Sequence, residues 1–198
     1  MPHRSHRFNG CGSNVAMLFV EPETTHGRAL VERYGASAVG QLPPDLAEAL
    51  VAPLRSGIAA GADDQALMAA GRHAIATLSG PAPPAASVDP RIGRAIEWVR
   101  ARLVLGVSLK EAAAAAHLSP SRFRHLFVAQ TGVTFRAYVL WARVEFAVAA
   151  MAGQSWTAAA QEAGFADSAH LSRTCRRMFG VAPATLVRET AGTRAGGH

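Results

Sequence analysis

Residues 164–183 read GFADSAHLSRTCRRMFGVAP, and this stretch decides which fold the sequence predicts. Gly164 is placed to end one helix, because glycine adopts the positive φ angles of helix C-termini at little cost. Asp167 is a good N-cap for a second helix, which we expect to run to Phe179. With a further helix expected over 155–163, the stretch predicts two short helices joined by a tight turn.

The same pattern occurs a second time, 47 to 48 residues earlier in the chain. There, helices are expected over 108–116 and 119–131. His117 takes the place of Gly164, and histidine is one of the few other residues enriched at positive φ. Two duplicated pairs of helices predict two helix-turn-helix units. The matched pairs are Ser108 with Ser155, Ala113 with Ala160, His117 with Gly164, Ser119 with Asp167, Phe123 with Leu171, Phe127 with Cys175 and Gly132 with Gly180.

The second helix of each unit has one apolar and one polar side. The polar side carries hydroxyl, imidazole and guanidinium groups, which can hydrogen-bond the edges of DNA bases or neutralise phosphates. We expect burial of Phe123, Leu126 and Phe127 in the first unit and of Leu171, Thr174, Cys175 and Met178 in the second. The side chains expected to face outward are Ser121, Arg122, Arg124, His125 and Val128, and Ser168, Ala169, Ser172, Arg173, Arg176 and Arg177.

Arginine is suited to guanine, because its planar fork of donors matches the O6 and N7 acceptors of that base. Arg176 and Arg177 lie further along their helix than Arg173, where a contact to the DNA backbone is expected.

Further helices are expected before, between and after the two units. Asp89 and Pro90 begin one, with an apolar stripe at Ile92, Ile96, Val99 and Leu103. Residues 134–152 predict a connecting helix of 19 residues, ~28 Å long. Its apolar side is expected at Phe135, Val139, Ala142, Phe146 and Ala149 or Ala150. Pro183 is expected to begin a short last helix.

Residues of about 90–190 resemble the AraC/XylS family of bacterial transcription regulators. The likeness is strongest over 164–183, which is similar to the family's second-repeat signature of a Gly-Phe turn, a Ser-Arg pair and a Phe-Gly-x-x-Pro ending. The first repeat fits through Leu118-Ser119-Pro120-Ser121, Phe123, Leu126-Phe127 and Thr131-Gly132.

The resemblance implies a seven-helix DNA-binding domain in which a long helix joins two helix-turn-helix units. It also implies promoter binding, and activation through contact with RNA polymerase. Matched by position, Ser121, Arg124 and His125 would face bases in the first unit, and Ser168, Ser172 and Arg173 in the second. Arg122 joins the base-facing set, and Arg176 and Arg177 are the expected phosphate contacts.

Three positions depart from the family pattern. Cys175 stands where an aromatic residue is usual, which suggests a looser core in the second unit. Trp141 replaces a usual basic residue on the connecting helix. Val128 stands where a basic residue is common, which removes an expected phosphate contact. Together these departures point to weaker or more restricted DNA binding.

The charge is distributed unevenly along the chain of 198 residues, whose net charge is +6. Residues 1–89 carry six arginines against eight acidic residues, a balance of −2. Residues 90–198 carry 13 arginines and one lysine against six acidic residues, a balance of +8. A basic module joined to a near-neutral one suggests a polyanionic partner.

Several other classes of protein lack support. Cys11 and Cys175 are far apart and form no CxxC, so no disulfide framework or zinc finger is expected. The apolar run over 15–20 is too short for a membrane span or a secretory signal. No phosphate-binding loop, HExxH or nucleophile elbow occurs. We therefore expect no enzymatic activity, no cofactor and no metal site, and interpret His3, His6 and His26 as surface histidines.

The predicted fold class is mainly α, with a short α(+β) remnant of a cupin-like regulatory domain at the N-terminus. We expect a truncated regulatory or dimerisation segment over 1–80, a Pro/Ala-rich linker over 81–88, the DNA-binding domain over 89–190 and a disordered tail over 191–198. Within the first segment, a strand is expected over 15–20 and helices over 45–52 and 64–78, with Pro53 ending or kinking the first helix. A naturally short regulator, an internal start and a misassigned start all stay open.

The predicted function is that of a cytoplasmic, nucleoid-associated bacterial regulator of transcription, most simply an activator. Its expected partners are double-stranded promoter DNA, RNA polymerase, a second copy through 1–80 and a small-molecule effector, with no membrane. The alternative is a dimerisation or ligand-binding accessory protein with weak or no specific DNA binding. The operator sequence, the effector and the choice between activation and repression are not contained in the sequence.

Overall fold

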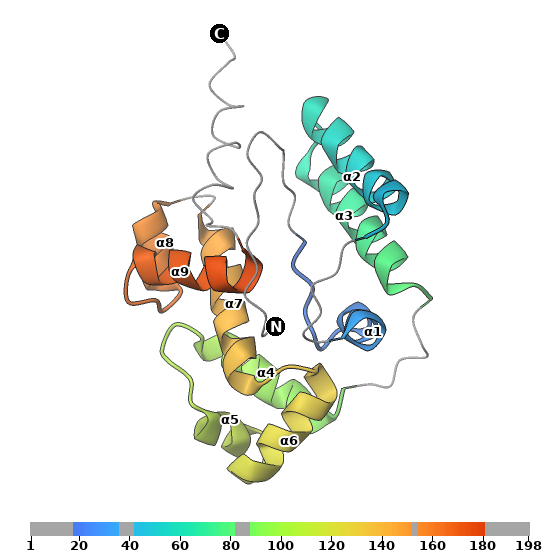
Figure 1. Cartoon of the computed structure of the whole chain (residues 1–198). Coiled ribbons are helices and arrows are strands. Elements are labelled where there is room, and N and C mark those ends of the chain that lie inside the picture. Colours follow the sequence, from blue (N-terminus) through green and yellow to red (C-terminus); the bar gives the residue numbers. More distant parts are fainter. Residues whose placement is uncertain (1–17, 36–41, 82–87, 152–153, 181–198) are drawn as a thin grey trace. The chain divides into compact units, whose positions relative to one another are not determined.

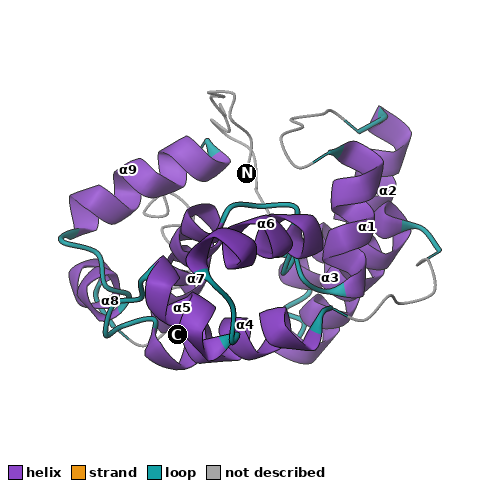
Figure 2. Cartoon of the chain, turned by 90° about the horizontal axis from the view of Figure 1, so that it is seen from below, coloured by secondary structure: helices purple, strands orange, loops and turns teal. Residues whose placement is uncertain are grey.

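The structure is a computed structural model, and it describes residues 18–35, 42–81, 88–151 and 154–180. The chain divides into two compact units, with the boundary between Ala86 and Ser87. The described residues contain helices and loops and no strand, as Figures 1 and 2 show. None of the helices in these residues is long and apolar enough to cross a membrane.

The N-terminal unit contains three helices, α1 (Thr25–Tyr34), α2 (Pro44–Ala59) and α3 (Asp64–Ser79), of which α3 contacts the other two. Its buried apolar residues are few, two leucines and two alanines. Gly71 of α3 is buried, and a Cβ added there would lie 3.1 Å from a methyl group of Leu18. Close approach at this glycine thus accompanies a small apolar core in this unit. The buried apolar residues are Ala29, Leu50, Leu54 and Ala74.

Several expectations for this unit differ from the structure. Of the expected strand, residues 15–17 lie outside the described residues, while residues 18–20 form no strand and Leu18 is 42% exposed. Helix α1 was not predicted; it has ten residues, and its apolar residues are confined to Ala29, Leu30, Val31 and Tyr34. Helix α2 continues through Pro53. Pro53 is exposed, so the carbonyl that loses its hydrogen bond to the proline can be hydrated.

The C-terminal compact unit contains α4 (Pro90–Arg102), α5 (Leu109–Ala115), α6 (Pro120–Thr131), α7 (Phe135–Ala150), α8 (Trp156–Glu162) and α9 (Ser168–Phe179). The two expected helix pairs are thus present as α5 with α6 and α8 with α9. The expected apolar stripe of α4 is confirmed, since Ile92, Ile96, Val99 and Leu103 are all at most 6% exposed. The last helix expected from Pro183, and the tail, lie outside the described residues.

The connecting helix α7 differs from its prediction in length and in its buried face. Thr134 is its N-cap and it ends at Ala150, so it has 16 residues and is ~24 Å long. Tyr138, Trp141 and Val144 are buried, whereas Phe146 is half-buried and Ala149 is exposed. Phe135 and Ala142 of the expected stripe are buried, so the stripe is confirmed in part. Further residues are buried outside the stripe because α7 contacts α6, α8 and α9. Figure 1 shows these helices arranged around α7.

Candidate nucleic-acid interface

The two helix-turn-helix turns have the same backbone geometry. His117 has a φ of 55° and Gly164 a φ of 77°, both in the left-handed region. In the first turn, the amides of His117 and Leu118 donate to the carbonyls of Ala114 and Ala113, each over 2.9 Å. The bonds from Gly164 to Gln161 and from Phe165 to Ala160 repeat this pattern with the same 2.9 Å distances. Each turn is therefore a Schellman motif, which satisfies the last carbonyls of the helix before it.

The recognition helices α6 and α9 begin and end in matched ways. Ser119 accepts a hydrogen bond from the amide of Arg122, and Asp167 accepts one from the amide of His170. Gly132 and Gly180, at φ 71° and 79°, end the two helices. The expected caps are confirmed, and they fix which residues lie in the first and last turn of each helix.

The core of the first unit is aromatic. The ring centroid of Phe127 lies 5.4 Å from that of Phe123, 5.6 Å from that of Phe135 and 5.4 Å from that of Tyr138. Most of these ring pairs are in edge-to-face contact, the geometry that aromatic quadrupoles favour. The expected burial of Phe123 and Phe127 is confirmed, while Leu126 is half-buried.

The buried residues of the recognition helix in the second helix-turn-helix unit carry no aromatic ring. Leu171, Thr174, Cys175 and Met178 are buried as expected. Burial raises the pKa of the Cys175 thiol to about 12, so the thiol is neutral and acts as a small apolar group. Trp141 of α7 is 6% exposed and its ring lies 6.0 Å from that of Tyr138, which makes it a core residue.

The outward-facing set of α6 lies where it was expected. Ser121, Arg122, Arg124 and His125 are exposed, and Val128 is 38% exposed. Ser121, Arg124, His125 and Val128 follow one another at intervals of three, one and three residues, so they share one face of α6. Arg122 lies beside this face rather than on it. No acidic residue occurs in the helix.

The outward-facing set of α9 is also accessible, with differences among its members. Arg173, Arg176 and Arg177 are exposed, whereas Ser168 and Ser172 are half-buried. Arg173 approaches the N-cap carboxylate of Asp167 at 4.0 Å, a solvent-exposed pair that leaves the guanidinium accessible. The N-cap Asp167 is acidic, and the helix α9 itself contains no acidic residue. The three arginines therefore give the exposed side of α9 a net positive charge.

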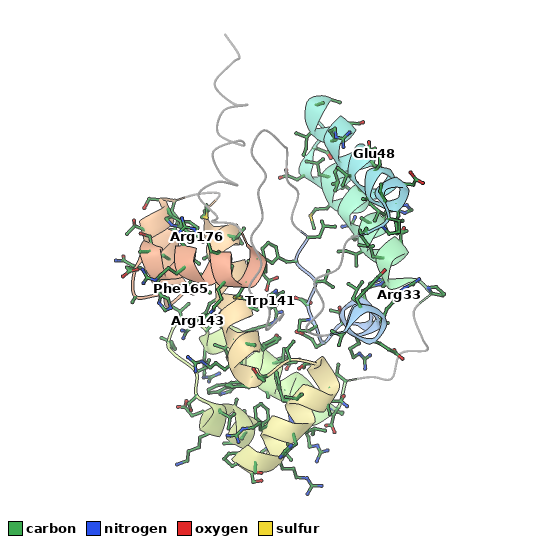
Figure 3. All side chains as sticks on the ribbon, viewed as in Figure 1. Arg33, Glu48, Trp141, Arg143, Phe165 and Arg176 are labelled. Atoms are coloured by element: carbon green, nitrogen blue, oxygen red, sulfur yellow. The ribbon has the colours of Figure 1, made fainter. Side chains whose placement is uncertain are left out.

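Sequence reasoning missed the polar contacts made by α7. Arg100 of α4 donates from Nε to the Tyr138 hydroxyl over 3.2 Å, and its Nη1 lies 3.8 Å from a carboxylate oxygen of Glu145. Arg143 donates from Nη1 to the carbonyl of Gly164 over 3.4 Å. Figure 3 shows Arg143 reaching from α7 toward the turn that carries Phe165. The available signal was the pair of charged residues, Arg143 and Glu145, within a largely apolar helix.

Residues that could suggest other chemistry have ordinary partners. His26 shares a hydrogen bond of 2.8 Å with the Ser79 hydroxyl. His3, His6 and Cys11 lie outside the described residues. Within the described ranges, no three His, Cys, Asp or Glu side chains gather as a metal ion would require.

Residues 112–189 match the family model described as a helix-turn-helix domain. The match begins inside α5 and extends through α9, so it contains most of the first unit and all of the second. No curated protein matches the chain.

The chain is also similar to three solved structures. A transcriptional regulator with an AraC-type DNA-binding domain from Chromobacterium violaceum is 23% identical, over 55% of this chain and 96% of that one, with a TM-score of 0.47. The DNA-binding domain of the transcriptional factor AdpA, in complex with a target DNA, is 23% identical over 54% and 98%, with a TM-score of 0.49. The C-terminal domain of AraT, a response regulator from Geobacillus stearothermophilus, is 18% identical over 52% and 87%, with a TM-score of 0.47.

Proposed function

We propose that this protein is a sequence-specific DNA-binding regulator of transcription, because residues 112–189 match a helix-turn-helix family model and the sequence of this region resembles the AraC/XylS family. One observation carries the proposal. Two recognition helices in matched frames both expose arginine together with serine or histidine side chains, and neither helix contains an acidic residue. Such groups hydrogen-bond base edges and neutralise phosphates.

The proposed binding mode places α6 and α9 of one chain in successive segments of the major groove. Those segments lie ~34 Å apart on one face of the duplex. Helix α7 supplies ~24 Å of this separation, and a helix with its side chains is about 10 Å across. The dimensions of the C-terminal compact unit therefore suit simultaneous insertion of α6 and α9.

The exposed side chains divide into two roles in this proposal. Arg176 and Arg177 contact phosphates, because they lie in the last turn of α9, beyond the residues that enter the groove first. Arg122 is exposed beside the face that Ser121, Arg124 and His125 share, so within the base-facing set it is the residue placed nearest to the DNA backbone. The base-facing residues are Ser121, Arg122, Arg124 and His125 in α6, and Ser168, Ser172 and Arg173 in α9.

The wider context of the proposal follows the family resemblance. We place the protein on the nucleoid of a bacterial cytoplasm, acting at promoters as an activator through contact with RNA polymerase. The N-terminal unit is assigned to association with a second copy and to a small-molecule effector. Its exposed apolar side chains, which include Val51, Ile58 and Met68, suit contact with another surface.

The test is binding of the purified full chain to duplex DNA at increasing salt. We expect the affinity to fall steeply with salt, because phosphate contacts release counterions. Arg173→Ala should relax the preference at one base position, with a loss of discrimination of about 1–3 kcal/mol. Arg177→Ala should weaken binding to all sequences about equally.

Absence of duplex binding at low salt would overturn the proposed function. It would leave the alternative, an accessory protein that dimerises or binds a ligand. In that case both arginine variants would behave as the unaltered chain in any assay of protein association.

A further inference from the structure

Arg143 is a charged residue of α7 whose side chain hydrogen-bonds the backbone of the turn between α8 and α9. Its Nη1 donates to the Gly164 carbonyl over 3.4 Å. A Cβ added to Gly164 would lie 3.4 Å from Cζ, 3.5 Å from Nε and 3.6 Å from Nη2 of Arg143. These three similar distances mean that one face of the guanidinium is turned toward the position that a Cβ of residue 164 would take.

Gly164 is already constrained from its other side. Its amide donates to the Gln161 carbonyl over 2.9 Å, and the next amide, of Phe165, donates to Ala160. With the carbonyl held by Arg143, both polar atoms of Gly164 are fixed. The chain then reaches the N-cap Asp167 within three residues, so the orientation of this turn sets the direction in which α9 leaves it.

The other face of α7 belongs to the first unit. Tyr138, five residues before Arg143, packs its ring on Phe127 of α6 and accepts a hydrogen bond from Arg100 of α4. Five residues correspond to about 140° around a helix, so the two side chains leave α7 in different directions. One helix thus holds the first unit through Tyr138 and the second through Arg143.

The matched position of the first helix-turn-helix unit cannot make this contact. The residue 47 positions before Arg143 is Ile96, which is buried in α4 and has no polar atom to offer its turn. The Arg143 guanidinium is costly to place there, since its Nε is buried and makes no hydrogen bond within the described part of the chain. A partly unsatisfied arginine at this position indicates a role beyond filling space.

We infer that Arg143 is a positioning residue for DNA recognition, which fixes the orientation of α9 relative to α7 and thereby the placement of the second recognition helix. This inference rests on the proposed function. It assigns Arg143 no contact with DNA, and it predicts that loss of the guanidinium disturbs recognition by α9 while recognition by α6 is retained.

The test begins with selection of duplexes from a random pool by the full chain. The expected product is a two-part motif, whose halves are assigned by Arg124→Ala for α6 and Arg173→Ala for α9. Arg143→Gln should lower discrimination in the α9 half by about threefold to tenfold and leave the α6 half unchanged. Arg143→Lys, which retains a donor, should retain part of that discrimination.

The matched control is Arg136→Gln, which removes the same charge from an exposed position on the same helix. It should leave the ratio between the two halves unchanged. Equal weakening of both halves by Arg143→Gln, or no change in either, would overturn the inference. If Arg143→Gln does not fold, Arg143→Lys is judged by the same ratio. Failure of the unaltered chain to enrich any duplex would overturn the proposed function and this inference together.

Discussion

In the first helix-turn-helix unit, α6 packs Phe123 and Phe127 against the aromatic rings of α7, with centroid distances of 5.4 to 5.6 Å among neighbours. In the second unit, the matched positions of α9 hold Leu171 and Cys175. Both pairs are almost completely buried. The same backbone frame is therefore filled by rings in one copy and by smaller side chains in the other.

The outer surfaces of the two units differ as well. The arginines of α6 are Arg122 and Arg124, in its first two turns, whereas α9 carries Arg176 and Arg177 in its last turn. The positions of α6 matched to that last pair are Val128 and Ala129. The two units therefore share the geometry of their turns and caps, and differ in the size of the buried side chains and in the charge of the exposed ones.

The largest expected effect concerns the two cores. Phe127→Ala should lower the free energy of unfolding of the full chain by about 3–5 kcal/mol, because it leaves a cavity in the ring cluster. Cys175→Ala, at the matched position, should cost about 1 kcal/mol, because it removes one atom. Urea unfolding followed by circular dichroism measures both. Equal losses would show that the second core depends on Cys175 as strongly as the first depends on its rings.

The next effect concerns the charge at the ends of the recognition helices. Arg176→Ala with Arg177→Ala should weaken binding to every duplex by about tenfold to a hundredfold and reduce the slope of log affinity against log salt by roughly 2. The matched control, Val128→Ser with Ala129→Ser, should leave the slope unchanged. Fluorescence anisotropy over a salt series provides the measurement. An unchanged slope in the arginine variant would place the phosphate contacts elsewhere.

The smallest effect concerns the turns. Gly164→Ala should destabilise the protein by about 1–2 kcal/mol, because an L side chain is strained at a φ of 77°. His117→Gly, at the matched position, should change stability by less than about 1 kcal/mol, since a strained side chain is relieved while the unfolded chain gains freedom. Thermal unfolding distinguishes the two. A larger loss for His117→Gly would mean that the imidazole has a stabilising contact.

The helix boundaries of the C-terminal compact unit could be predicted because they depend on local chemistry. Ser119 and Asp167 satisfy backbone groups within three residues along the chain, and the predicted ends of α6 and α9 at Thr131 and Phe179 are confirmed. The apolar stripe of α4 could also be predicted, because the apolar residues repeat at helical spacing and lie on one buried face.

Features that depend on tertiary contacts could not be predicted in this way. The predicted buried face of α7 was incomplete, because a single stripe assumes one neighbour, whereas α7 contacts α6, α8 and α9. The bond from Arg143 to Gly164 joins residues 21 positions apart and leaves no periodic signal. The N-terminal helices were only partly predicted, because their core consists largely of alanine and glycine, whose burial no hydropathy pattern marks.

The most direct measurement of the central claim is a hydroxyl-radical footprint of the full chain on a selected duplex, at a stoichiometry of one chain per site. We expect two protected stretches on one face of the DNA, with centres separated by about 10 base pairs, because α6 and α9 enter successive major-groove segments. A single protected stretch, or none at concentrations that shift the duplex, would contradict the account.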